Sequence, residues 1–213
     1  MLGWAERHHQ AGRPGKPGGP ASRPLSVQVF DYDEERQALL VKRGYGNQGH
    51  DSTMRRRSMD IPIPKSGLPT EYSIRDLALC SQDDLKKRAA VANSAFDITM
   101  HTAETIRTLQ KAPTYRPELD LVVVGPDGAF VAYCVVWYDK TNRIGMFGPV
   151  GTDRAYWRRG LGKALMSEGL MRLAALKARM AYVHCDLDAA PNRLYESAGF
   201  TDHYRLYRWQ KEF

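Results

Sequence analysis

Apolar residues in the middle of the chain form two nearly continuous runs. These are "LDLVVV" (119–124) and "AFVAYCVVWY" (129–138), and both are rich in β-branched and aromatic residues. The four-residue turn "GPDG" joins them. The pattern therefore predicts a β-hairpin.

Apolar residues in the segment 81–96 follow helical spacing instead. Ser81 precedes this segment, and Asp84 follows three residues later, which is the arrangement of a capping box. The apolar stripe consists of Leu85, Ala89 and Ala92. We therefore predict a helix that begins after Ser81.

Continued along the chain, the same two spacings predict a mixed α/β domain. The predicted elements are a strand at 72–77, helices at 81–96 and 101–112, strands at 119–124, 129–138 and 144–150, a helix at 162–178, a strand at 181–187, a helix at 191–198 and a strand at 204–210. Hairpin connections in the middle of this order indicate antiparallel pairing there.

Residues 25–64 look like a partial copy of the end of this domain. They read as strand, helix and further strand, and "VQVFDYDEERQALLVKRGY" aligns without a gap on "YVHCDLDAAPNRLYESAGF" when Tyr45 is placed on Phe200, a shift of 155 residues. Asp31 then falls on Asp186, and Gly44 on Gly199. Repetition explains the matched order of elements, and chance similarity of two β–α units is the alternative.

The chain thus divides into three predicted parts. Residues 1–24 are rich in Gly, Pro and basic residues without helical spacing, which predicts a disordered leader. Residues 25–64 form the partial copy, and residues 70–213 form the main domain.

Charge and cysteine content narrow the classes of partner. The net charge is +7 with a pI near 9.4, but the basic residues gather in short clusters with no long stripe interleaved with aromatics. We therefore expect a small polyanion, such as a nucleotide or coenzyme A, and no nucleic acid. No apolar run approaches the ~20 residues of a membrane span.

The cysteines favour a reducing compartment, so we expect a cytoplasmic protein. There are three of them, without a CxxC motif, and Cys134 and Cys185 lie in apolar runs that suggest buried free thiols. No Cys/His spacing suggests zinc, so no metal is expected.

The stretch "WRRGLGKAL" (157–165) is the strongest candidate for binding chemistry. Gly160 and Gly162 remove two Cβ atoms at the predicted start of a helix, where free backbone N–H groups bind phosphate. The spacing matches neither GxxxxGK[ST] nor GxGxxG. Taken alone, the stretch is equally compatible with a basic turn that needs glycine for chain geometry.

In this order of elements, "GPVGTDRAYWRRGLGKALMSEGL" (148–170) and "NRLYESAGF" (192–200) resemble two motifs of the Gcn5-related N-acetyltransferase (GNAT) superfamily. The resemblance covers roughly residues 70–213. It implies a GNAT fold, with a central mixed, mostly antiparallel sheet flanked by helices. It also implies acetyl-CoA as co-substrate and an amine as acceptor, and pairing into homodimers is common in the family.

The resemblance implies functions for particular residues. The backbone of 158–163 would cradle the coenzyme A pyrophosphate, and Tyr195 would protonate the leaving thiolate, although it can also be read as a core aromatic. The cofactor-binding set implied is Val150, Thr152, Arg158, Arg159, Gly160, Leu161, Gly162, Lys163, Ala164, Asn192 and Tyr195.

Two positions depart from the family pattern. Trp157 stands where Gln or Arg usually begins the loop, and Asp188 stands where Asn is common. Asp188 can hold a substrate amine or a water, or it can cap the short helix, which we favour.

The general base is not identified by sequence. The candidates are Asp139, Glu168, His184, Asp186 and Asp188. Asp186 and Asp188 rank first because they end a strand near the expected groove, and a chain of waters is the alternative. The oxyanion would be stabilised by a strand N–H between Phe147 and Val150.

The sequence therefore predicts an N-acetyltransferase that moves an acetyl group from acetyl-CoA to a primary amine of an acceptor that it does not identify. We favour a small molecule as acceptor, and protein N-termini or lysines are the other reading. The partial copy has Leu40 where the second unit has Tyr195, and it has no preceding glycine loop, so it resembles the tail of a first acetyltransferase repeat. This half repeat and Trp157 favour an alternative, a degenerate module that binds acyl-CoA or a protein partner without catalysis.

Overall fold

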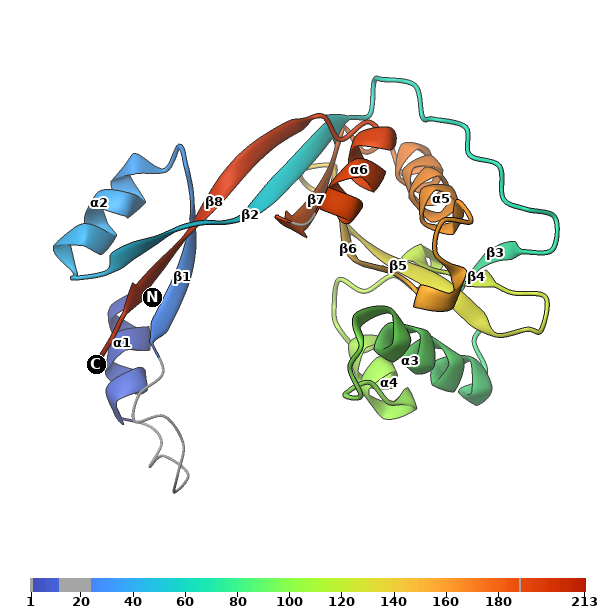
Figure 1. Cartoon of the computed structure of the whole chain (residues 1–213), viewed down its shortest axis with the longest axis horizontal. Helices are drawn as coiled ribbons and strands as arrows, with labels where there is room; N and C mark the ends of the chain where they lie inside the picture. Colours follow the sequence, from blue (N-terminus) through green and yellow to red (C-terminus); the bar gives the residue numbers. More distant parts are fainter. Residues whose placement is uncertain (1, 12–23, 188) are drawn as a thin grey trace. The chain divides into compact units, whose positions relative to one another are not determined.

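A computed structural model describes residues 2–11, 24–187 and 189–213 (Figure 1). The chain divides into two compact units. One contains the residues up to Met54 together with Tyr204–Phe213, and the other contains Arg55–His203. Strand β2 therefore contributes its first part to one unit and its last residues to the other.

Apart from α1, the helices and strands follow the predicted order, with shifts at their ends. The helices are α1 Leu2–Ala11, α2 Glu34–Lys42, α3 Gln82–Phe96, α4 Ala103–Leu109, α5 Leu161–Ala175 and α6 Ala189–Ser197, with short 3₁₀ turns at Pro117–Leu119 and Arg154–Tyr156. The strands are β1 Leu25–Phe30, β2 Gly46–Ser58, β3 Ser73–Asp76, β4 Asp120–Val124, β5 Phe130–Asp139, β6 Ile144–Thr152, β7 Met180–Asp186 and β8 Asp202–Lys211.

The strands join in the order β1-β8-β2-β7-β6-β5-β4-β3. β3, β4, β5 and β6 pair antiparallel in succession, β1 pairs antiparallel with β8, and β6 pairs parallel with β7. The prediction of a mixed, mostly antiparallel sheet flanked by helices is confirmed.

Local sequence signals begin and end these elements as predicted. Ser81 caps α3, and its side chain and that of Asp84 each accept a backbone N–H of the other residue, which completes the capping box. The hairpin turn closes through a hydrogen bond from the Gly128 N–H to the Gly125 carbonyl, 2.9 Å long. Gly128 has φ +76°, a conformation that favours glycine.

Helices cover both faces of the sheet in the larger unit. α3 packs on β5 and β6, where Val91 and Ala92 meet Phe130 and Tyr133. α5 and α6 pack on the opposite face around the main core. A Cβ at Gly169 of α5 would stand 2.5 Å from the Phe147 ring, so this glycine lets α5 approach β6 closely.

A buried ion pair ties α3 to β4. Arg88 and Asp120 are 1% and 0% exposed, and the Arg88 Nε donates to Asp120 Oδ1 over 2.9 Å. The Tyr115 hydroxyl donates to the other carboxylate oxygen over 3.0 Å. Burial raises the pKa of the Asp120 carboxyl, and the neighbouring Arg88 opposes that shift.

The smaller unit surrounds a core of its own. Val29, Leu40, Tyr45 and Trp209 are buried together, and Leu2 of α1 packs against them. Helix α1 lies within the segment where the sequence predicts a disordered leader. Its contacts come from distant residues, including an ion pair of 2.8 Å between Glu6 and Arg43, so local spacing did not reveal it. Residues 12–23 of that leader lie outside the described residues.

The two β–α units coincide element by element under the predicted shift of 155 residues. Leu25–Phe30 maps onto 180–185 within β7, and Glu34–Lys42 maps onto α6. Both helices end alike: the Tyr45 N–H donates to the Leu40 carbonyl, and the Phe200 N–H donates to the Tyr195 carbonyl, each over 3.0 Å. The glycines between, Gly44 and Gly199, have φ of +80° and +87°.

Candidate active site

Strands β6 and β7 pair along only the first half of β6. Their parallel register runs from Ile144 opposite Met180 to Phe147 opposite Val183. Beyond Phe147, β6 stays paired with β5 as far as Thr152, after a register shift in β5 between Cys134 and Val136. The edge of β6 around Val150 therefore offers backbone groups to an extended ligand.

Six consecutive backbone N–H groups are free at the glycine loop that follows. In the described part of the chain, the amides of residues 158–163 have no hydrogen-bond acceptor, and the first bond of α5 runs from the Ala164 N–H to the Gly160 carbonyl over 3.0 Å. Arg158 has φ +61° and Gly160 has φ +79°. A run of free amides at a helix N-terminus is suited to an anion.

The two glycines of the loop serve different purposes. Gly160 needs its positive φ, while a Cβ there would meet no atom within 4 Å. A Cβ at Gly162 would stand 3.2 Å from Leu194 of α6 and 3.7 Å from the Thr152 side chain. Gly162 therefore allows the first turn of α5 to lie close to both α6 and the end of β6.

The basic side chains of the loop, Arg158, Arg159 and Lys163, differ in their contacts. Arg159 holds the loop, because it donates to the Tyr72 hydroxyl over 2.7 Å and to the Ala155 carbonyl over 3.3 Å. Arg158 and Lys163 make no hydrogen bond or ion pair within the residues that the structure describes. These two side chains are therefore the cations available to an anion at the loop.

Trp157 closes the loop onto the preceding strand. Its indole Nε1 donates to the Thr152 carbonyl over 2.8 Å, and the side chain is 57% exposed. The residue that departs from the family pattern thus has a structural contact that sequence reasoning did not assign.

Tyr195 lies on α6 with only 6% of its surface exposed. Its ring makes an edge contact with Phe200, at 6.5 Å between centroids. Burial raises the pKa of the Tyr195 hydroxyl well above its usual range, and the nearby Cys185 and Cys134 thiols raise it further. The hydroxyl therefore keeps its proton at neutral pH. The neighbouring Leu194 contacts the Gly162 position, which links this helix to the glycine loop.

Asn192, predicted to face the cofactor, is held by protein contacts on both ends of its amide. Its Oδ1 accepts from the Arg55 Nε over 2.8 Å and from the Cys185 thiol over 3.2 Å. Its Nδ2 donates to the Asp186 carbonyl over 3.1 Å. Sequence analysis gave Arg55 no function, because the strand of Arg55 and the helix of Asn192 are far apart in the chain.

The candidate bases differ in their surroundings. Asp139 accepts from Thr141 and Asn142 in the turn before β6, and these bonds lower the pKa of its carboxyl. Glu168 accepts from Arg172 over 2.8 Å.

The remaining candidates lie on β7 or directly after it. Asp186 is exposed at the end of β7, and His184 lies half-buried in the same strand. Asp188 lies outside the described residues. Among the described candidate carboxylates, Asp186 is therefore the one at the end of β7, and its side chain is not held by a turn or helix hydrogen bond like those of Asp139 and Glu168.

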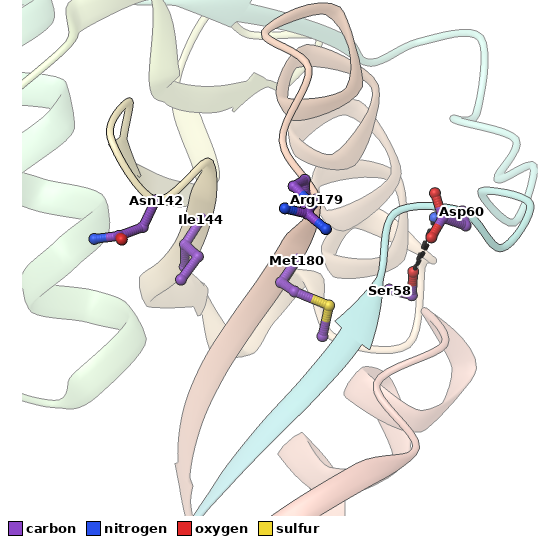
Figure 2. A pocket seen from close by; sticks show the side chains of 6 residues that line it. All are labelled: Ser58, Asp60, Asn142, Ile144, Arg179 and Met180. Atoms are coloured by element: carbon purple, nitrogen blue, oxygen red, sulfur yellow. Dashed lines mark hydrogen bonds between the residues drawn. The ribbon is translucent and has the colours of Figure 1, made fainter.

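A separate surface groove of about 260 Å³ lies at the opposite end of β6 and β7 (Figure 2). Ile144 and Met180 open these two strands, and Ser58 donates to Asp60 over 2.9 Å at its rim. The lining is Ser58, Asp60, Asn142, Ile144, Arg179 and Met180. The groove is therefore distinct from the glycine loop.

The described residues contain neither a metal-binding group nor a membrane-spanning helix. No group of three or more His, Cys, Asp or Glu side chains there is arranged to hold a metal ion. None of the described helices combines the length and the apolar character needed to cross a membrane. All three cysteines are free, with Cys134 and Cys185 buried as predicted.

The model of the acetyltransferase (GNAT) family matches residues 90–200, which is just over half of the chain. The chain belongs to this family of acetyltransferases. A search of the curated proteins found no match.

Several solved structures share the fold. A GCN5-related N-acetyltransferase from Sphaerobacter thermophilus superposes with a TM-score of 0.69 at 22% identity, over 98% of this chain and 66% of that one. A tandem GNAT protein from the clavulanic acid biosynthesis pathway gives 0.72 at 15% identity, over 90% and 64%. A GCN5-related N-acetyltransferase from Kribbella flavida gives a TM-score of 0.61 at 17% identity, over 89% of this chain and 68% of that one. The chain spans just under two thirds of the length of the first two.

Proposed function

We propose that this protein is an acetyl-CoA-dependent N-acetyltransferase that acts on a primary amine of a small molecule. The observation that carries the proposal is the run of free amides at residues 158–163, beside a strand edge that opens at Phe147. Gly162 brings that loop against Leu194, next to the buried Tyr195. Family membership supports acetyl transfer in general.

The residues present fit coenzyme A at this loop. The amides of residues 158–163 would bind the pyrophosphate oxygens, and Arg158 and Lys163 would add charge. A Cβ at Gly160 would enter open space, so the approach to the loop at this point is unobstructed. The free edge of β6 near Val150 would bind the extended arm by backbone hydrogen bonds.

The protein supplies three functions in the reaction. The thioester carries the acetyl group to be transferred. A backbone N–H of β6 between Phe147 and Val150 would stabilise the charge that develops on the carbonyl oxygen. Tyr195 would protonate the leaving thiolate, because its hydroxyl holds a proton at neutral pH. Asp186 would accept the amine proton, either directly or through water.

We further propose that residues 25–64 descend from a first acetyltransferase repeat. The coincident element bounds and the matching hydrogen bonds at Tyr45 and Phe200 support this. So does the likeness in fold to a tandem GNAT protein of greater length.

Thermal unfolding with acetyl-CoA tests the proposed site. Acetyl-CoA at 100 times its Kd should stabilise the native chain by about 2.7 kcal/mol, which raises Tm by roughly 5–11 °C. Gly160→Glu should abolish the shift, because it places a negative charge among the amides.

Gly128→Glu is the matched control. Gly128 has φ +76° against +79° at Gly160, and neither Cβ would meet an atom within 4 Å, so both substitutions carry the same backbone strain. The control should keep the shift. If the folded native chain gives no shift, the cradle does not bind acetyl-CoA. A shift without turnover on any amine would favour the non-catalytic module, in which Trp157 has replaced the usual loop residue.

A further inference from the structure

Three consecutive arginines at the end of β2 divide between two environments. Arg55 and Arg57 are 8% and 2% exposed, whereas Arg56 points the opposite way, as alternation in a strand requires. Arg56 pairs with the exposed Asp202 over 3.3 Å. Arg55 and Arg57 are therefore buried on one face of β2, whereas Arg56 lies on the more exposed face.

Arg55 binds α6 with its whole guanidinium. The Nε donates to Asn192 Oδ1 over 2.8 Å, and one Nη donates to Glu196 Oε1 over 2.9 Å. The other Nη donates to the Phe200 carbonyl over 3.1 Å. Asn192 and Glu196 lie one turn apart on α6, so the Arg55 guanidinium binds the helix at the turn that contains Tyr195.

Arg57 binds the end of the same helix. One Nη donates to the Ala198 carbonyl over 2.8 Å, and the other donates to the Ile61 carbonyl over 2.8 Å. A guanidinium at a helix C-terminus satisfies an otherwise unpaired carbonyl and is favoured by the helix dipole. Arg57 also packs at 3.5 Å from the Cβ position of Gly199, where the helix ends.

We propose that Arg55 and Arg57 are positioning residues for the acetyl transfer, holding α6 so that the Tyr195 hydroxyl meets the opening between β6 and β7. This inference rests on the proposed function. Both arginines precede residues 90–200, the part that the family model matches. The support for the helix that carries Tyr195 is thus supplied by the last strand of the partial copy.

A consequence is that the two arginines act on turnover more than on acetyl-CoA binding. Neither Arg55 nor Arg57 contacts the loop at 158–163 through any of the hydrogen bonds described for it. A shift of about 1 Å in a catalytic group can cost ~100-fold in rate. Loss of either arginine should therefore lower kcat and leave the KM for acetyl-CoA nearly unchanged.

The experiment compares Arg55→Met and Arg57→Met with the matched control Arg56→Met, which removes the same charge from the same strand. We expect kcat to fall about 10- to 100-fold in the first two, with the KM for acetyl-CoA and the control kcat within about twofold of the native values. Arg55→Lys should recover part of the loss. Equal kcat values in all three variants, or a parallel loss of acetyl-CoA binding in Arg55→Met, would overturn the proposal.

Two further measurements keep the proposal testable. If Arg55→Met does not fold, Glu196→Ala removes one contact from the more exposed side, and an unchanged kcat would count against positioning.

The second measurement uses ¹⁹F NMR of fluorotyrosine-labelled protein, with the Tyr195 signal assigned by its loss in Tyr195→Phe, and it needs no turnover. That signal should move in Arg55→Met and Arg57→Met and stay in place in Arg56→Met. The same signal in all three would refute positioning, even if the chain proves not to be an enzyme.

Discussion

Helices α2 and α6 end in the same way but are held differently. Both are nine residues long and stop at a glycine with positive φ, followed by a buried aromatic residue whose N–H bonds back to the helix. Two residues before its final residue, α6 has Tyr195 and α2 has Leu40, and both side chains are buried.

The surroundings of the two helices differ. Two buried arginines bind α6 and the residues after it. Around α2, the Lys211 ammonium lies 5.7 Å from the Tyr45 ring, and the ion pair of Arg43 with Glu6 is partly exposed. The shared features thus serve to end a helix against a sheet, and the features that differ are those that the proposed chemistry needs.

The strongest test of this comparison is to exchange Tyr195 of α6 and Leu40 of α2. Tyr195→Leu should lower kcat by ~10²–10⁴-fold if the hydroxyl is the general acid, and it should also lower Tm, because Leu is smaller than Tyr and leaves part of the buried site unfilled. Steady-state kinetics on an accepted amine would measure this. Activity within threefold of native would remove Tyr195 from the mechanism.

The reverse exchange, Leu40→Tyr, is the control. It should add no activity, because the described residues before α2 contain no glycine loop, and overpacking should cost about 1–3 kcal/mol of unfolding free energy.

A second comparison uses the two terminal glycines and has a smaller expected effect. Gly44→Ala and Gly199→Ala should each cost about 1–2 kcal/mol, because both glycines adopt the left-handed conformation. Urea unfolding would measure the difference. Gly199→Ala should also lower kcat, because the strain falls directly after Ala198, whose carbonyl accepts from Arg57. A loss of kcat in Gly44→Ala as well would show that the two units are not separable in this way.

The smallest expected effect concerns the start of α2. The Asp33 side chain accepts the Arg36 N–H over 3.1 Å as the N-cap. Asp33→Ala should therefore cost about 1 kcal/mol and leave kcat unchanged, as read by urea unfolding and kinetics. A change in kcat would indicate that the smaller unit takes part in the reaction.

Much of the fold could be predicted because its signals are local. The hairpin turn, the capping box at Ser81 and the glycine that ends α6 each depend on residues within a few positions of one another. Helix α1 was missed because its stabilising contacts, such as Glu6 with Arg43, come from residues about 40 positions away in the chain.

The candidate site could be predicted in its backbone and less well in its side chains. The free amides at 158–163 follow from the glycines and the helix start, which sequence reveals. Arg159 belongs to the predicted cofactor-binding set, and its side chain donates to Tyr72, a residue 87 positions away. Asn192 similarly binds Arg55, 137 positions away.

By itself, the sequence determined the order of most elements, the glycine loop and the family resemblance, because each depends on the spacing of neighbouring residues. Only the tertiary structure decided which strand lies beside β7, which of three arginines face α6, and where β6 and β7 part. Those outcomes depend on which side chains from distant parts of the chain pack together in the core. The spacing of neighbouring residues does not reveal such contacts.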